Sequence, residues 1–103
     1  MARLALLLAL LAGTAVAGPP DAARQDQLRR LVRQDCGSCH GLRLTGGLGR
    51  PITAGALAGR DVDDLSGVIL DGMPGTAMPG WRPLLTEDEA RWIADYLLTT
   101  ETE

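Results

Sequence analysis

Five consecutive residues constrain this chain more than any other feature of its sequence. Residues 36–40 read C-x-x-C-H and contain the only two cysteines and the only histidine. This spacing is typical of covalent haem attachment, because the two thiols reach two vinyl groups along one porphyrin edge and the histidine then faces the iron. We therefore expect Cys36 and Cys39 to bind one haem c through thioether bonds, with His40 as an axial ligand of the iron.

Three other kinds of site can contain a C-x-x-C pair. A thioredoxin-type dithiol belongs to a βαβ unit, and the sequence has no strand pattern. A closed zinc site needs four ligands, and no cysteine or histidine lies outside the motif. A structural disulfide would fit an exported chain, but it would leave the position of His40 unexplained. The spacing therefore favours haem.

The start of the chain has the pattern of a cleaved signal peptide. Arg3 supplies a positive charge, residues 4–12 form an apolar run, and residues 15–17 form an A-x-A cleavage site. The apolar run is shorter than the roughly 20 residues that span a bilayer; an uncleaved membrane anchor is the alternative. We expect residues 1–17 to be removed on export, leaving residues 18–103 as one periplasmic domain without stable membrane insertion.

The exported chain has little material for a hydrophobic core. It has no Phe, and its only large rings are Trp81, Trp92 and Tyr96. A domain of this size usually needs an additional stabilising element, such as disulfides, a metal or a cofactor. A porphyrin would be such an element. The net charge is −3 and all ten basic residues are arginine. They are not clustered as nucleic-acid binding would require.

Hydrophobic periodicity predicts an all-α fold. Helices are expected over residues 21–34, 61–71 and 87–98, each with apolar residues on one face. Between the first two, residues 41–59 contain six glycines and Pro51, which predict a long irregular loop. Capping signals mark the helix ends: Asp21, Asp61, the Thr86–Glu89 capping box and Gly72.

An electron carrier needs a second axial ligand, and only a thioether is left to supply it. Met1 belongs to the expected signal peptide, which leaves Met73 and Met78. Met78 precedes Pro79 in a turn-rich segment, whereas Met73 suits a flexible gap filler. These features favour Met78 without excluding Met73. A His/Met pair fills both axial positions, so we expect electron transfer and no enzyme activity.

The sequence also offers candidates for contacts around the haem. An axial imidazole normally donates its other N–H to an acceptor that fixes the ring. The backbone carbonyl of Pro51 is the expected acceptor, although this proline alternatively only shapes the loop. Charge or hydrogen bonding would let one of four groups pair with the haem propionates; they are Arg50, Arg60, Arg82 and the indole of Trp81.

These features together resemble the class I c-type cytochromes. The shared features are the first helix leading into the C-x-x-C-H motif, the Gly-rich loop, Met78 with its following proline, and a last helix carrying Trp92 and Tyr96. The resemblance implies three to four helices and long loops around one haem, with His40 and Met78 as axial ligands. It also implies that the first helix crosses the last.

Residues 34–41, 44–49 and 69–79 are similar to a subgroup of this family, the small periplasmic monohaem cytochromes associated with haem-cd nitrite reductase in denitrifying bacteria. The resemblance implies a monomeric single-electron carrier in denitrification, with haem-cd nitrite reductase as its redox partner. The alternative is an accessory factor in maturation of nitrite reductase or its d-type haem, and a small-ligand sensor would require a displaceable methionine. Because the chain has no lysine, docking would depend on arginine or on apolar contacts at the haem edge.

Overall fold

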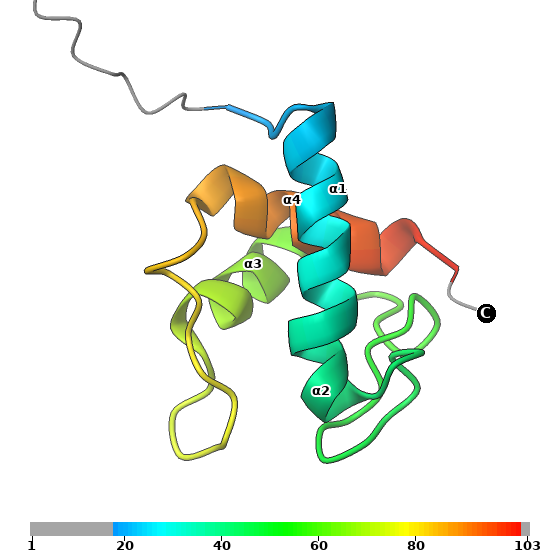
Figure 1. Ribbon diagram of the computed structural model, residues 1–103. Coiled ribbons are helices and arrows are strands. Elements are labelled where there is room, and N and C mark those ends of the chain that lie inside the picture. Colours follow the sequence, from blue (N-terminus) through cyan, green and yellow to red (C-terminus); the bar gives the residue numbers. More distant parts are fainter. Residues whose placement is uncertain (1–17, 102–103) are drawn as a thin grey trace, which may run out of the picture.

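The structure is a computed structural model that describes residues 18–101. Within that range the chain consists of helices joined by irregular segments and contains no strand (Figure 1). This confirms the predicted all-α fold. The signal peptide predicted for residues 1–17 lies outside the described residues. None of the helices in the described range is long and apolar enough to cross a membrane.

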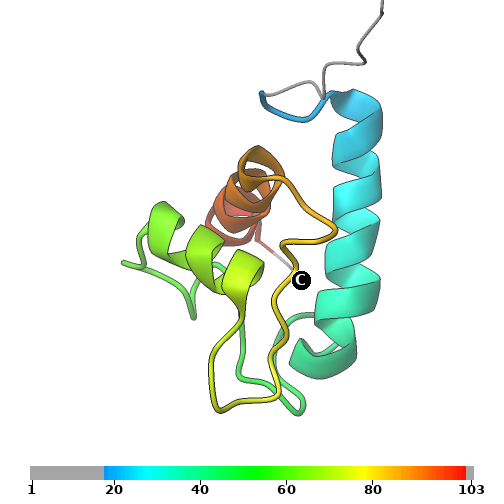
Figure 2. The same ribbon diagram turned by 90° about the vertical axis from the view of Figure 1, so that its left-hand side faces the viewer.

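The first helical segment is a single column that runs to the end of the C-x-x-C-H motif (Figure 2). It comprises α1 (Ala22–Leu31), the π-helical turn η1 (Val32–Cys36) and α2 (Gly37–His40). The helix was predicted to end at residue 34, before the motif. It continues because the Gly37 N–H donates to the Val32 carbonyl, and it ends at Gly41, which takes a positive φ of 93° directly after His40.

The other two helices lie within a residue of their predicted bounds. α3 spans Val62–Asp71 and α4 spans Glu87–Thr99. Every predicted cap is present: at the N-termini a side chain offers an acceptor to backbone N–H groups that have no partner within the helix, and at the end of α3 a glycine takes a positive φ. These caps are Asp21 for α1, Asp61 for α3, the Thr86–Glu89 capping box for α4, and Gly72 with φ 70° at the end of α3.

α4 lies between α1 on one side and α3 on the other (Figure 2). The contact of α1 with α4 confirms the crossing of first and last helices that the resemblance implies. Leu28 of α1 and Ile93 of α4 are the largest fully buried side chains. At the edge of this core the Trp92 and Tyr96 rings stack with centroids 5.3 Å apart, and the Arg29 guanidinium lies 5.4 Å from the Trp92 centroid.

The segment between α2 and α3 is irregular, as its glycines predict. Two buried leucines, Leu44 and Leu57, attach it to the core. A hydrogen bond of 2.9 Å from the Ile52 N–H to the Leu44 carbonyl closes its first part. The loop therefore has a defined path over the end of the first helical column.

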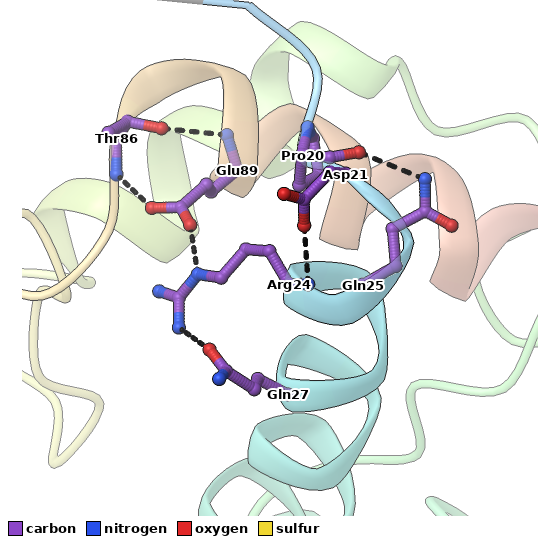
Figure 3. Close-up of polar contacts among 7 residues, drawn as sticks. All are labelled: Pro20, Asp21, Arg24, Gln25, Gln27, Thr86 and Glu89. Carbon is purple, nitrogen blue, oxygen red and sulfur yellow. Dashed lines mark hydrogen bonds and ion pairs between the residues drawn. The ribbon is translucent and has the colours of Figure 1, made fainter. Parts of the chain in front are cut away.

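A charged network joins the first turns of α1 and α4 (Figure 3). The Arg24 Nε donates to one carboxylate oxygen of Glu89, and the Thr86 N–H donates to the other at 3.0 Å. The Glu89 side chain is only 13% exposed. The bond from Arg24 is the main cause that lowers the pKa of Glu89 below its ordinary value. This carboxylate both completes a capping box and holds the two helices together.

We predict that Glu89→Gln destabilises the protein at neutral pH by about 1 kcal/mol, since partial exposure screens the pair. A lowered folded pKa gives stability that is present above the ordinary glutamate pKa of about 4.3 and is lost as the pH falls through the lowered value. The difference from wild type should therefore shrink in strong acid. Denaturant unfolding across pH measures it, with Asp88→Asn in the same turn as control. A difference that stays constant into strong acid would contradict this role.

A second prediction concerns two glycines, Gly67 within α3 and Gly72 directly after its last residue. A Cβ on Gly67, inside the helix, would have no atom within 4 Å. We expect Gly67→Ala to raise stability by about 0.5–1 kcal/mol, because alanine loses less backbone entropy on forming a helix. At Gly72 a Cβ would lie 2.6 Å from the Met78 carbonyl oxygen, so Gly72→Ala should destabilise. Thermal unfolding of both variants checks the opposite signs.

Candidate haem-binding site

The two cysteines lie on the last turns of the helical column in different surroundings. Cys36 is half-buried and packs against the hydrophobic core, whereas Cys39 is exposed. They are not joined in a disulfide. Burial, and then the nearby charge of Asp35, raise the pKa of Cys36 to about 11. Because neither sulfur is used in a disulfide, both side chains are available for bonds to another group.

The imidazole of His40 is oriented by a backbone acceptor. Its Nδ1 lies 2.7 Å from the carbonyl oxygen of Arg50. Because a carbonyl oxygen only accepts, Nδ1 must carry a proton, and in the neutral ring Nε2 then keeps its lone pair. This is the tautomer that can ligate a metal through Nε2.

The acceptor is thus one residue before the Pro51 carbonyl that we predicted. The reason is the register of the Gly-rich loop on the helix end: the Gly46 N–H donates to the His40 carbonyl and the Gly49 N–H to the Cys39 carbonyl, both at 2.8 Å. That register brings the Arg50 carbonyl to the ring. Pro51 is exposed and lies near Gly46, which fits the alternative that it shapes the loop.

Gly49 is a site residue that the sequence did not single out. A Cβ at this position would lie 2.8 Å from both Cε1 and Nδ1 of His40. Only a glycine lets the loop lie this close to the ring without displacing it. The signal in the sequence was the density of glycines after the motif, but that density does not reveal which glycine faces the histidine.

The two candidate methionines lie in the segment between α3 and α4. Met78 is half-buried, whereas Met73 is 48% exposed. The Thr76 hydroxyl donates to the Met73 carbonyl at 2.7 Å and accepts from the Met78 N–H at 3.3 Å. Residues 72–80 lie at the same end of the molecule as α2 (Figures 1 and 2). The fold therefore brings the methionine segment and the C-x-x-C-H motif to one end.

The four candidates for propionate contacts differ in their surroundings. Arg82 is already engaged, because its Nε and Nη2 donate to the two carboxylate oxygens of Asp71 at 2.8 and 2.9 Å. This pairing lowers the pKa of Asp71 and raises that of Arg82. Arg50 and Arg60 are exposed, and Trp81 is half-buried against the core. Arg82 is therefore the least available of the four.

The donor atoms at this end of the molecule fit a haem c. Two free thiols stand on one helix with an imidazole whose Nδ1 donates to the backbone, and a half-buried thioether belongs to the segment at the same end of the molecule. Residues 18–101 contain no group of three His, Cys, Asp or Glu side chains placed to hold a metal ion.

Comparison with known proteins defines the class. Residues 23–97 match the sequence model of a family described as "Cytochrome C oxidase, cbb3-type, subunit III". The chain therefore belongs to this family of c-type cytochromes, which bind haem c. This confirms the c-type cytochrome class that the C-x-x-C-H motif and the methionine segment indicate.

Three curated relatives share the description Cytochrome c55X. The protein of Paracoccus denitrificans is 91% identical over the full length of both chains. That of Pseudomonas aeruginosa is 56% identical, covering 80% of this chain and 69% of its own length. That of Stutzerimonas stutzeri is 52% identical, covering 95% of this chain and 88% of its own length.

Two solved structures are similar in fold. The c-type cytochrome NirC superposes with a TM-score of 0.75 at 56% identity, over 77% of this chain and 93% of that one. The dihydro-heme d1 dehydrogenase NirN, solved in complex with DHE, gives a TM-score of 0.66 at 31% identity over 73% of this chain. Only 16% of NirN is matched, so the likeness concerns one part of that longer protein.

We predict that Gly49→Ala disturbs the histidine side of the site. The added methyl group must push the His40 ring or the loop, and the strain should cost about 1–3 kcal/mol of stability in the haem-loaded protein. Guanidinium unfolding and the NMR signal of the Nδ1 proton measure the effect. Gly55→Ala is the control, since a Cβ there meets no atom within 4 Å. Equal behaviour of the two variants would contradict the close packing of Gly49 on His40.

Proposed function

We propose that this protein is an exported single-electron carrier of the nitrite reductase system in denitrification. It carries one haem c, attached to Cys36 and Cys39, with His40 and Met78 as the axial ligands. The observation that carries the proposal is the His40 imidazole, which a backbone acceptor holds with Nε2 available, beside two free thiols. Membership of the c-type cytochrome family supports the same cofactor.

Each residue has a definite task in this assignment. A bound haem supplies a one-electron iron couple. Cys36 and Cys39 would hold its edge, and the Arg50 carbonyl keeps the His40 ring in one orientation. With His40 and Met78 both holding the iron, no coordination site would be left for a substrate. The assignment is therefore a carrier and not an enzyme.

The proposed place of action follows from the sequence and the relatives. The signal-peptide pattern of residues 1–17 directs the chain to the periplasm. The similarity to NirC and to part of NirN supports a role beside haem-cd nitrite reductase, because NirN is described as acting on dihydro-heme d1. We propose that enzyme as the redox partner of a monomeric carrier.

Stopped-flow mixing tests this directly. The reduced, haem-loaded protein is mixed with oxidised haem-cd nitrite reductase, and the absorption bands of both haem proteins are followed. Rapid oxidation with a second-order rate constant supports donation. Absence of transfer, from a protein whose spectrum shows His/Met ligation, would leave a cytochrome with a different partner.

A second function rests on the likeness to NirN. Because that relative is a dihydro-heme d1 dehydrogenase, the same cytochrome unit could serve the making of d-type haem rather than supply the finished reductase. Deleting the gene distinguishes the two. A nitrite reductase isolated without its d-type haem would favour the maturation role, whereas a fully loaded reductase that receives electrons slowly in the cell would favour donation.

We predict that Met78→Ala abolishes the iron–sulfur charge-transfer band of the oxidised protein and lowers its reduction potential, because a thioether ligand raises the potential. Met73→Ala is the matched control and should change neither property, since that side chain is 48% exposed and Met78 is the more buried of the two. Absorption spectroscopy and potentiometry measure both. If Met73→Ala loses the band and Met78→Ala keeps it, the ligand assignment is reversed.

A further inference from the structure

A hollow of about 300 Å³ opens on the side of the molecule where α1 passes the C-terminal end of α4. Three arginines, Arg29, Arg33 and Arg43, line it, and Glu101 is its only acidic side chain among the described residues. We call this surface the arginine hollow. None of the four haem-ligand candidates lies in its lining, so it is separate from the site described above.

The arginines of the hollow differ in what holds them. Arg29 is fixed by an ion pair of 2.7 Å to Asp26 and by its position over the Trp92 ring. Arg33 and Arg43 are exposed, and within residues 18–101 neither forms an ion pair. Two guanidinium groups with five N–H donors each therefore face solvent beside an anchored third one.

At the opposite, N-terminal end of α4, acidic side chains outnumber basic ones. A second hollow, of about 470 Å³, lies there between α3 and α4. Both of its arginines are paired with acidic side chains: Arg82 with Asp71 and Glu87, and Arg91 with Asp63. The N-terminal end of α4, orange in Figure 1, thus lies beside an acidic surface, and its C-terminal end, in red, lies beside a basic one. The net charge of the chain is −3.

We propose that the arginine hollow is a docking surface for an acidic patch on the redox partner; this inference rests on the proposed carrier function. A hollow of 300 Å³ admits one or two carboxylate side chains. Arg33 and Arg43 offer the planar donor pairs that bind carboxylates through two parallel hydrogen bonds. Leu42, which lines the hollow and is 78% exposed, supplies an apolar contact beside them.

The position of the hollow suits electron transfer. Arg33 lies in the π-helical turn that leads directly into the C-x-x-C-H motif, and Arg43 follows the motif closely in the chain. A partner bound at these side chains is therefore next to the haem-binding end. The separation of acidic and basic side chains also orients this weakly acidic protein so that its basic side faces an acidic partner. Salt largely screens this attraction at distances beyond about 10 Å at 0.1 M ionic strength.

The test uses a carboxylate-terminated gold surface as the acidic probe and an ammonium-terminated surface as its opposite. Haem-loaded protein is passed over both, surface plasmon resonance measures the bound protein, and voltammetry on the same film measures electron transfer. We expect binding to the carboxylate surface at low ionic strength, despite the negative net charge, and release at high salt. Binding only to the ammonium surface would overturn the proposal.

Charge reversal locates the binding surface. Arg33→Glu and Arg43→Glu should each weaken binding to the carboxylate layer about tenfold. Arg30→Glu, which makes the same charge change at an exposed arginine of α1 outside the lining of the hollow, should weaken it far less. Equal losses in all three variants would overturn the proposal, because net charge alone would then explain them. Arg33→Gln and Arg43→Gln give the milder comparison if a reversed charge impairs haem loading.

The two readouts separate failure of docking from failure of the carrier function. Protein that binds the carboxylate layer through the hollow but gives no reversible voltammetric wave contradicts electron transport. Protein that gives a reversible wave in solution but does not bind contradicts the docking surface alone.

Discussion

The hydrogen bond from His40 to the Arg50 carbonyl is the contact on which the rest of the site depends. It fixes the tautomer of the imidazole, and with it the nitrogen that can bind a metal. The bond exists only because the Gly-rich loop folds back on the helix end through two backbone bonds, to the Cys39 and His40 carbonyls. Those carbonyls are the unpaired acceptors that every helix leaves at its C-terminus. The same folding back of the loop therefore both ends the helix and orients the His40 ring.

The sequence predicted the parts of this fold that local chemistry decides. Caps such as Asp61 and the Thr86–Glu89 box appeared as expected, because they need only a side-chain acceptor at a fixed offset from the helix. The π-helical turn before the motif was missed. A single extra residue in a helical turn leaves no mark on hydrophobic periodicity over so short a stretch.

The contacts that depend on how the loop aligns with the helix end could not be predicted from the sequence. The acceptor for His40 was placed at Pro51 and lies at Arg50, a shift of one residue that the Gly49 N–H bond determines. Likewise, the sequence offered Arg82 as a candidate partner of the haem propionates, whereas the fold brings it against Asp71, eleven residues away. Both outcomes follow from tertiary contacts between segments whose relative position no local pattern encodes.

The two sides of the candidate site are held with unequal firmness. His40 ends a continuous helical column and is fixed by backbone bonds of 2.7–2.8 Å on its ring and its carbonyl. The bonds made by the Met78 backbone are longer, 3.3 Å from its N–H to the Thr76 hydroxyl and 3.4 Å from the Met73 N–H to its carbonyl. Longer bonds allow larger local opening at low cost. The backbone around His40 is therefore held more firmly than the backbone around Met78.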